Sequence, residues 1–152
     1  MPEAFVVDAA ARPQALNVVG EQIAVLAPAS RTGGYEVFNQ KGPEASGPPP
    51  HAHDWDESFY VISGEIAFGM GQESQIARAG AFVHIPAGVT HWFRFGAGGG
   101  EMISMTSRGG ASQLFADLDR ETAGGPLDLE RLAAVAVRNG LTVALPQSAG
   151  PG

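Results

Sequence analysis

The sequence contains no cysteine, and its only lysine is Lys41. The first absence excludes disulfide bonds, thiol nucleophiles, iron–sulfur clusters and cysteine-ligated zinc. Basic residues are scarce as well, because 9 lysines and arginines stand against 16 acidic residues and leave a net charge of −7. A basic surface that would bind nucleic-acid phosphates or anionic lipids is therefore not expected. We predict no nucleic acid and no membrane among the partners.

Long apolar runs are also missing, since none approaches the roughly 20 residues that a membrane-spanning helix needs. The first residues, Met1-Pro2-Glu3, do not resemble the charged start of a secretory signal. We therefore expect a cytoplasmic protein. The length of 152 residues and the hydrophobic fraction of 44% predict a single globular domain over residues 1–145, with a frayed tail at 146–152.

Glycine and proline are plentiful, at 21 and 11 residues, and they separate short apolar runs along the chain. Short runs between regular turn signals are typical of an all-β sandwich or barrel. We interpret Ser63-Gly64 as a turn between two such runs. The expected strands cover residues 4–8, 22–27, 35–39, 57–62, 65–70, 75–78, 81–85, 91–95 and 102–106.

The hydrophobic period changes near residue 112, which predicts two short helices within residues 112–140. Ser112 suits the N-cap of the first helix, and Asp128 suits that of the second. From Leu129 onward, apolar residues recur at i, i+3, i+4 and i+7. Gly140 then ends the second helix.

Three histidines and one glutamate are the candidate ligands of a metal site. His51 and His53 stand two residues apart, so both imidazoles lie on one face of an extended segment. Glu57 follows them, and His91 comes later, after the turn at Pro86–Gly88. A pair of strands can bring these side chains together, and three imidazole nitrogens with a carboxylate suit a first-row divalent metal. Zinc held by all four would be closed and structural, whereas six-coordinate iron, manganese or nickel keeps two positions open.

This arrangement resembles the two motifs of the cupin superfamily. The first motif is matched by His51, His53, Glu57 and Gly64, and the second by Gly80, Pro86, Gly88 and His91. The sequence departs from the pattern twice, because Phe95 replaces the preferred asparagine and Gly47 lies four residues before His51 rather than six. The motifs span residues 47–95, and their flanks resemble the small single-domain group often labelled quercetin-dioxygenase-like.

The resemblance implies an all-β fold, a single jelly-roll-like cupin β-barrel with two short C-terminal α-helices. It also implies one divalent transition metal held by His51, His53, Glu57 and His91, with Glu57 doubling as the catalytic base. Fe²⁺ is favoured, while Mn²⁺, Ni²⁺, Co²⁺, Cu²⁺ and Zn²⁺ stay open. His84 is expected to be structural. Cupins commonly pair, and the apolar leading strand at residues 5–7 has an edge to protect, so we expect a homodimer.

Three classes of function follow from this resemblance. The first is a metal-dependent dioxygenase, an oxidoreductase acting on a small aromatic or enolisable compound of the flavonol or diketone kind. The second is a non-redox metal-dependent isomerase, decarboxylase or lyase, in which Glu57 or a water molecule moves protons. The third is a cupin that binds a small ligand without catalysis.

Apolar residues share strand faces with the expected ligands. Phe59 and Val61 have the parity of Glu57, and Phe93 and Phe95 have the parity of the ligand His91. Such residues either fill the core of a small barrel or line an apolar substrate pocket. We predict a substrate pocket at Phe59, Val61, Phe93 and Phe95, and we expect Trp55 at its mouth or on the outer face of the barrel.

Overall fold

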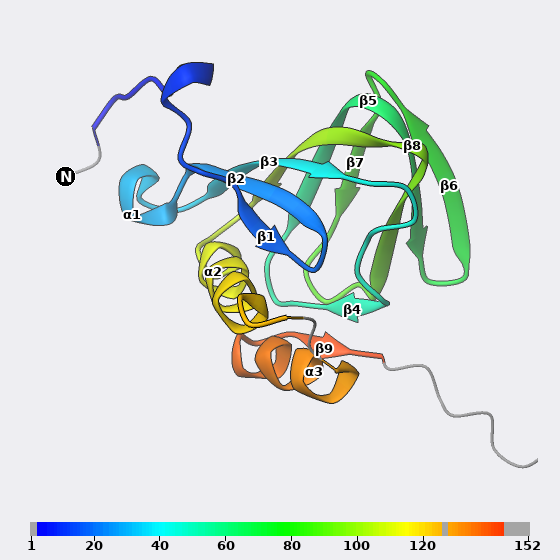
Figure 1. Ribbon diagram of the computed structural model, residues 1–152. Coiled ribbons are helices and arrows are strands. Elements are labelled where there is room, and N and C mark those ends of the chain that lie inside the picture. Colours follow the sequence, from blue (N-terminus) through cyan, green and yellow to red (C-terminus); the bar gives the residue numbers. More distant parts are fainter. Residues whose placement is uncertain (1–2, 126–127, 145–152) are drawn as a thin grey trace, which may run out of the picture.

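Residues 3–125 and 128–144, which this computed structural model describes, form one curled β-sheet with helices at its open end (Figure 1). The strands are β1 (Leu16–Val18), β2 (Glu21–Ala27), β3 (Glu36–Gly42), β4 (His51–Ala52), β5 (Glu57–Met70), β6 (Glu73–Arg78), β7 (Phe82–Ile85), β8 (His91–Thr106) and β9 (Thr142–Val143). The helices are a 3₁₀ turn at Ala9–Ala11, α1 (Ala29–Thr32), α2 (Ala111–Thr122) and α3 (Leu129–Arg138). The predicted all-β fold with two C-terminal helices is confirmed, and the frayed tail predicted at 146–152 lies outside the described residues.

The two longest strands, β5 and β8, pair with each other at the centre of the sheet. They pair antiparallel from Glu57 opposite Thr106 to Met70 opposite His91, with register shifts near Gly64. The strand β8 also pairs with β3 and with β4. The single strand β5 replaces the two runs and the turn that we predicted at Ser63-Gly64, because the chain bends there without reversing.

Gly64 shows why this bend needs glycine. Its φ is +79°, and a Cβ atom at this position would lie 2.3 Å from the carbonyl oxygen of Gly99 on β8. Only glycine tolerates both the left-handed backbone and such a close approach. The two bent strands can therefore curl the sheet into a half-barrel.

The hydrophobic core has two parts. The first fills the barrel and contains Phe59, Val61, Ile66, Phe68, Ile85, Phe93, Phe95 and Met102. The second lies between β1–β3 and the C-terminal helices and contains Val18, Ile23, Phe38, Trp55, Leu114, Leu118 and Val135. The helices thus cover apolar surface at the mouth of the barrel rather than its outer wall.

The N-termini of α1 and α2 meet at one buried carboxylate. Glu36 on β3 accepts hydrogen bonds from the backbone N–H of Ala29 and from both the N–H and the hydroxyl of Ser112. Ser112 was predicted to be an N-cap, and this is wrong, because the cap is Gly110 and the carboxylate of Glu36 satisfies the first turn instead. The cap predicted at Asp128 is confirmed, since its side chain accepts from the N–H of Arg131.

The helix α3 is fastened at its C-terminal end. Asn139, its C-cap, donates a hydrogen bond to Asp117 on α2 at 3.0 Å. The next residues form β9, which pairs with β4 and places Val143 opposite His51. The helical cover is thereby tied to the strand that carries a candidate ligand.

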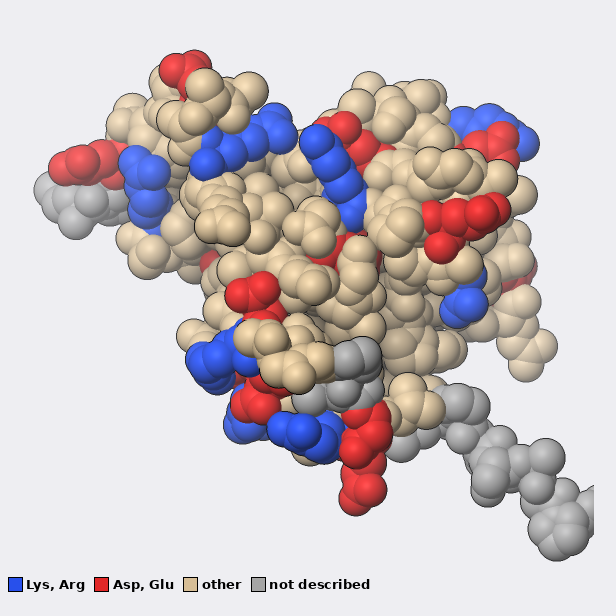
Figure 2. Space-filling model, viewed as in Figure 1, with Lys and Arg blue, Asp and Glu red and all other residues tan. Residues whose placement is uncertain are grey.

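The strand predicted at residues 4–8 is wrong, because these residues lead into the 3₁₀ turn without forming ladder bonds (Figure 1). On the face drawn in Figure 2, lysine and arginine side chains lie among acidic ones rather than in a separate basic area. No helix in the described part of the chain is long and apolar enough to cross a bilayer.

Candidate metal centre

Three histidines come together where β4 meets β8. The register pairs His51 directly with His91, and His53 follows just after β4. All three are buried, with exposed fractions of 8% for His51, 6% for His53 and 1% for His91. Each offers one ring nitrogen within 4.8 Å of the others, a grouping that could hold a metal ion.

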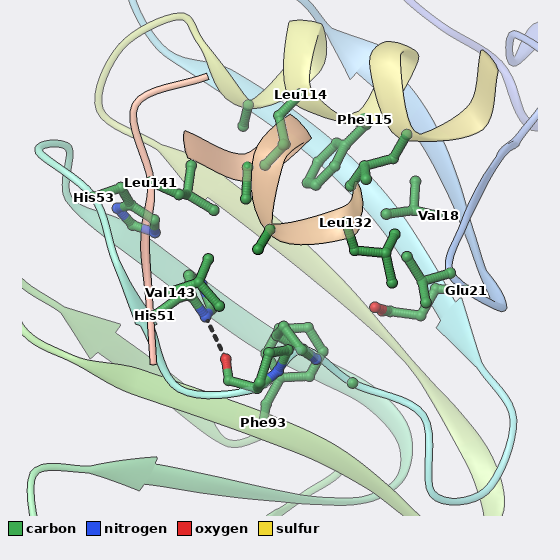
Figure 3. A pocket seen from close by; sticks show the side chains of 18 of the residues that line it. Val18, Glu21, His51, His53, Phe93, Leu114, Phe115, Leu132, Leu141 and Val143 are labelled. Atoms are coloured by element: carbon green, nitrogen blue, oxygen red, sulfur yellow. Dashed lines mark hydrogen bonds between the residues drawn. The ribbon is translucent and has the colours of Figure 1, made fainter. Parts of the chain in front are cut away.

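Backbone carbonyls fix the tautomer of each ring. The Nδ1 atoms lie at hydrogen-bond distance from the carbonyl oxygens of Pro49 (His51, 2.9 Å), Trp55 (His53, 3.0 Å) and Val89 (His91, 2.8 Å). Figure 3 draws the first of these bonds as a dashed line. A carbonyl can only accept, so Nδ1 carries the proton and Nε2 keeps its lone pair. This is the usual arrangement of metal-binding histidines.

The Nε2 atoms of the three rings make no hydrogen bond in the described structure. Those of His53 and His91 are buried and lack a hydrogen-bond partner among the described residues. A buried nitrogen without a partner costs about 1–3 kcal/mol. A divalent ion would satisfy these lone pairs, so the residues fit a metal.

Glu57, at the start of β5, lies beside the cluster. Its Oε2 is 2.9 Å from Nε2 of His53, yet the contact lacks the orientation of a hydrogen bond. We interpret the two atoms as lone pairs directed at a common point rather than as an ion pair. The structure therefore brings together all four side chains that the sequence singled out, with the histidines forming the inner group.

Burial keeps the rings of His51 and His91 neutral. Desolvation, followed by repulsion from His91, lowers the pKa of His51 to about 4. Desolvation also lowers the pKa of His91. Neutral rings at physiological pH present lone pairs that are ready for a cation.

An apolar pocket opens beside the histidines, with a volume of about 180 Å³. Most of its walls come from β1–β3, the loop from Gly47 to Trp55, and the helices α2 and α3, and β5, β8 and the segment around β9 complete them (Figure 3). Leu114, Phe115 and Leu132 supply the helical side. The helices therefore shape the pocket that His51 and His53 border.

Of the predicted pocket residues, Phe93 lines this pocket. Phe59, Val61 and Phe95 are at most 1% exposed and belong to the barrel core. They pack behind Phe93, whose ring makes edge contacts with those of Phe59 and Phe95. Strand parity places all of these side chains inward, but the depth of the barrel separates the lining residue from the core.

Several lining residues had no signal in the sequence. Trp55, expected at the pocket mouth or on the outer face, is 3% exposed, stacks on the ring of His53 at 4.4 Å and lines the pocket, so the outer face is excluded. Glu21 on β2 and Gln40 on β3 also line the pocket and are buried. Only long-range pairing of β1–β3 with β8 brings them to the site. His84, by contrast, is exposed on β7 and contacts the hydroxyl of Ser58, as a surface residue would.

Comparison with known proteins agrees with this geometry. Residues 41–104 match the family described as a cupin domain. The matched region includes His51, His53, Glu57 and His91, so the whole candidate centre lies within it.

Solved structures share the cupin fold at low sequence identity. KdgF from a Halomonas species superposes with a TM-score of 0.63 at 17% identity, covering 70% of this chain and 94% of that one. An RmlC-like cupin from Shewanella frigidimarina gives 0.62 at 19% identity, with 70% and 91% covered. An uncharacterized protein of Streptomyces coelicolor is 43% identical over 44 residues, which are 29% of this chain and 40% of that protein. The likeness to the two solved structures shows the fold and leaves the reaction open.

The structure shows how the two cupin motifs meet. The N–H of Gly88, in the turn of the second motif, donates to the carbonyl of His53 in the first at 2.8 Å. The N–H of Gly80 donates to the carbonyl of Val61 at 2.9 Å. The motif glycines therefore hold the ligand-bearing segments against each other.

Proposed function

We propose that this cupin is a metal-dependent dioxygenase that acts on a small aromatic or enolisable compound, of the flavonol or diketone kind. One observation carries the proposal: a buried histidine cluster borders an apolar pocket, and Nε2 of His53 and of His91 has no hydrogen-bond partner among the described residues. A site for a sugar or another polar metabolite would need a polar lining, whereas most of the lining here is aliphatic or aromatic.

His51, His53 and His91 would hold the ion, with Glu57 as a fourth ligand. A divalent iron, manganese or nickel ion bound there would supply Lewis acidity toward a substrate oxygen and redox chemistry toward dioxygen. Fe²⁺ is the ion that we favour.

Glu57 serves the substrate as a base. Its carboxylate lies within reach of the cluster and lines the pocket, so it can take the acidic proton of an enolisable substrate as that substrate binds. Phe93, Trp55 and the leucines of α2 and α3 hold the apolar body of the substrate and exclude water.

The first experiment tests the metal. We expect about one transition-metal ion per chain in the purified protein and a large loss of metal in His91→Ala. His84→Ala, which removes an exposed histidine outside the cluster, is the control and should keep its metal. Wild-type protein without a transition metal, even after reconstitution, would contradict the proposal.

The second experiment tests the reaction. Oxygen uptake is measured with 3-hydroxyflavone and with 1-phenyl-1,3-butanedione, in wild type and in His91→Ala. Uptake that matches substrate loss, and that His91→Ala abolishes, supports a dioxygenase. Conversion of a substrate under argon would instead indicate the non-redox isomerase, decarboxylase or lyase, and binding without conversion would indicate a ligand-binding cupin.

A further inference from the structure

Glu21 is a buried carboxyl group that the metal centre does not use. It is the first residue of β2, directly after the turn at Val19-Gly20, where both residues have positive φ. Such a position usually faces solvent, yet Glu21 is only 5% exposed and points to the same side as the buried Ile23. The register places Gln40 opposite Ile23, so two polar side chains stand together on an otherwise apolar inner face.

Glu21 also lacks partners. Its Oε1 is buried and accepts or donates no hydrogen bond within the described residues. The contrast with Glu36 is direct, because that buried carboxylate accepts three hydrogen bonds. Buried polar atoms in proteins are almost always satisfied, so an exception calls for an explanation.

The pocket supplies that explanation. Glu21 lines it, and Figure 3 shows the carboxyl group pointing into the space across from His53. Its neighbours there include Val18 and Leu132, which cannot hydrogen-bond. Burial, followed by repulsion from Glu57, raises the pKa of Glu21 to about 8. At neutral pH the group is thus mostly protonated and offers both an O–H donor and a carbonyl acceptor.

We propose that Glu21 is a specificity-determining residue of the pocket, whose neutral carboxyl group donates a hydrogen bond to a carbonyl or enol oxygen of the substrate. This inference rests on the proposed function, in that the pocket receives the substrate. It narrows the substrate class to apolar molecules with an oxygen acceptor in addition to any oxygen held at the histidines. A ligand of that kind satisfies the partnerless side chain, whereas a hydrocarbon of the same shape leaves it unpaired.

Three probes of nearly one shape test this inference. Acetophenone carries a carbonyl oxygen, cumene replaces that oxygen with a methyl group, and 1-phenylethylammonium places a cation there. Dissociation constants are measured by calorimetry on the full chain as purified, under argon. Comparing the ratio of two constants between variants cancels the different solubilities of the probes.

We expect the preference for acetophenone over cumene to fall about tenfold in Glu21→Leu, the effect of one hydrogen bond. Glu21→Gln keeps an N–H donor and should keep the preference within about threefold. Glu73→Leu, which changes an exposed glutamate on β6, is the matched control and should leave the ratio unchanged. Circular dichroism checks that each variant is folded.

Three outcomes would overturn the inference. They are an unchanged ratio in Glu21→Leu, no binding of acetophenone to wild type, and tightest binding of the ammonium probe, which would show a charged carboxylate. A protein without oxygen uptake but with the expected ratios would defeat the dioxygenase and leave the role of Glu21 standing. Oxygen uptake with unchanged ratios would support the dioxygenase and overturn the role of Glu21.

Discussion

In each site histidine, one ring nitrogen contacts the backbone and the other belongs to the candidate metal centre. Nδ1 is held by a backbone carbonyl, which leaves Nε2 available for the ion that we propose. Glu57 has no such backbone partner among the described hydrogen bonds, and its contact with His53 is off the hydrogen-bond axis. The three rings are therefore fixed in orientation, whereas the Glu57 carboxylate is less constrained, which suits the roles of ligand and base that we propose for them.

Glu57→Gln separates these roles. The amide keeps the shape but loses the charge and the basicity, so three imidazoles should retain much of the metal. Turnover should fall about a hundred- to ten-thousand-fold, the usual cost of removing a general base. Metal analysis beside the rate of substrate conversion measures both. Full activity at normal metal content would assign Glu57 a purely positional role.

Glu21 makes stability depend on pH. Its pKa is raised by burial and then by Glu57 from 4.5 to about 8. The folded state therefore binds its proton more tightly than the unfolded state, so stability is full below pH 4.5 and declines as the pH rises toward 8. In Glu21→Gln this decline should be absent.

Urea unfolding at pH 5 and pH 8.5 measures this effect. The unfolding free energy of Glu21→Gln relative to wild type should rise between these pH values by at least about 1 kcal/mol, since one pKa unit corresponds to about 1.4 kcal/mol. Glu73→Gln serves as the exposed control. Parallel pH profiles for wild type and Glu21→Gln would mean that Glu21 is ionised in the folded protein.

Among the secondary-structure elements, α1 and α2 depend on one side chain from β3. Glu36 satisfies N–H groups of both first turns while 1% exposed. Glu36→Ala leaves those donors buried without a partner and should lower the unfolding free energy by about 2–4 kcal/mol. Ser112→Ala removes only the hydroxyl bond and should cost about 1 kcal/mol. Equal losses in urea denaturation would contradict the shared role of the carboxylate.

Elements were predictable from sequence where the signal is local. Alternating residues locate β2, β3 and β7, and Asp128 caps α3 as the pattern indicated. The continuity of β5 and β8 was not predictable, because glycines that bend a paired strand look like glycines that turn a chain. Whether Gly64 does one or the other depends on β8, about 35 residues away, and no local pattern records that pairing.

At the scale of the whole molecule, the candidate ligands were predictable from local sequence signals, whereas most of the pocket was not. The proposed ligands lie in two compact motifs, and the spacing within these motifs singles them out in the sequence. The pocket is assembled mainly from β1–β3, the motif loop and the helices, so Glu21 and Gln40 reach it only through tertiary packing. The homodimer stays a prediction, and its original argument is weakened because residues 4–8 form no strand. Sedimentation at micromolar concentration tests it, and a monomer alone would contradict it.

The metal should also hold the mouth of the barrel together. Within the described residues, the two-residue strand β4 pairs with β8 only at His51 opposite His91, and β9 pairs only with β4. An ion joining these histidines adds a link between β4 and β8, and through β9 it reaches α3. The central pairing of β5 with β8 spans both strands and needs no ion.

Metal removal should therefore loosen one part of the molecule and spare another. Hydrogen exchange is compared between loaded and chelator-treated protein. Amides of residues 51–57 and 141–144 should exchange about a hundredfold faster without the ion, when the loaded sample holds free metal at about 100 times Kd. Amides of residues 100–106 should change little. His91→Ala should reproduce the loosened pattern without chelator and His84→Ala should not, whereas uniform acceleration along β5 and β8 would mean that the ion stabilises the entire barrel rather than its mouth.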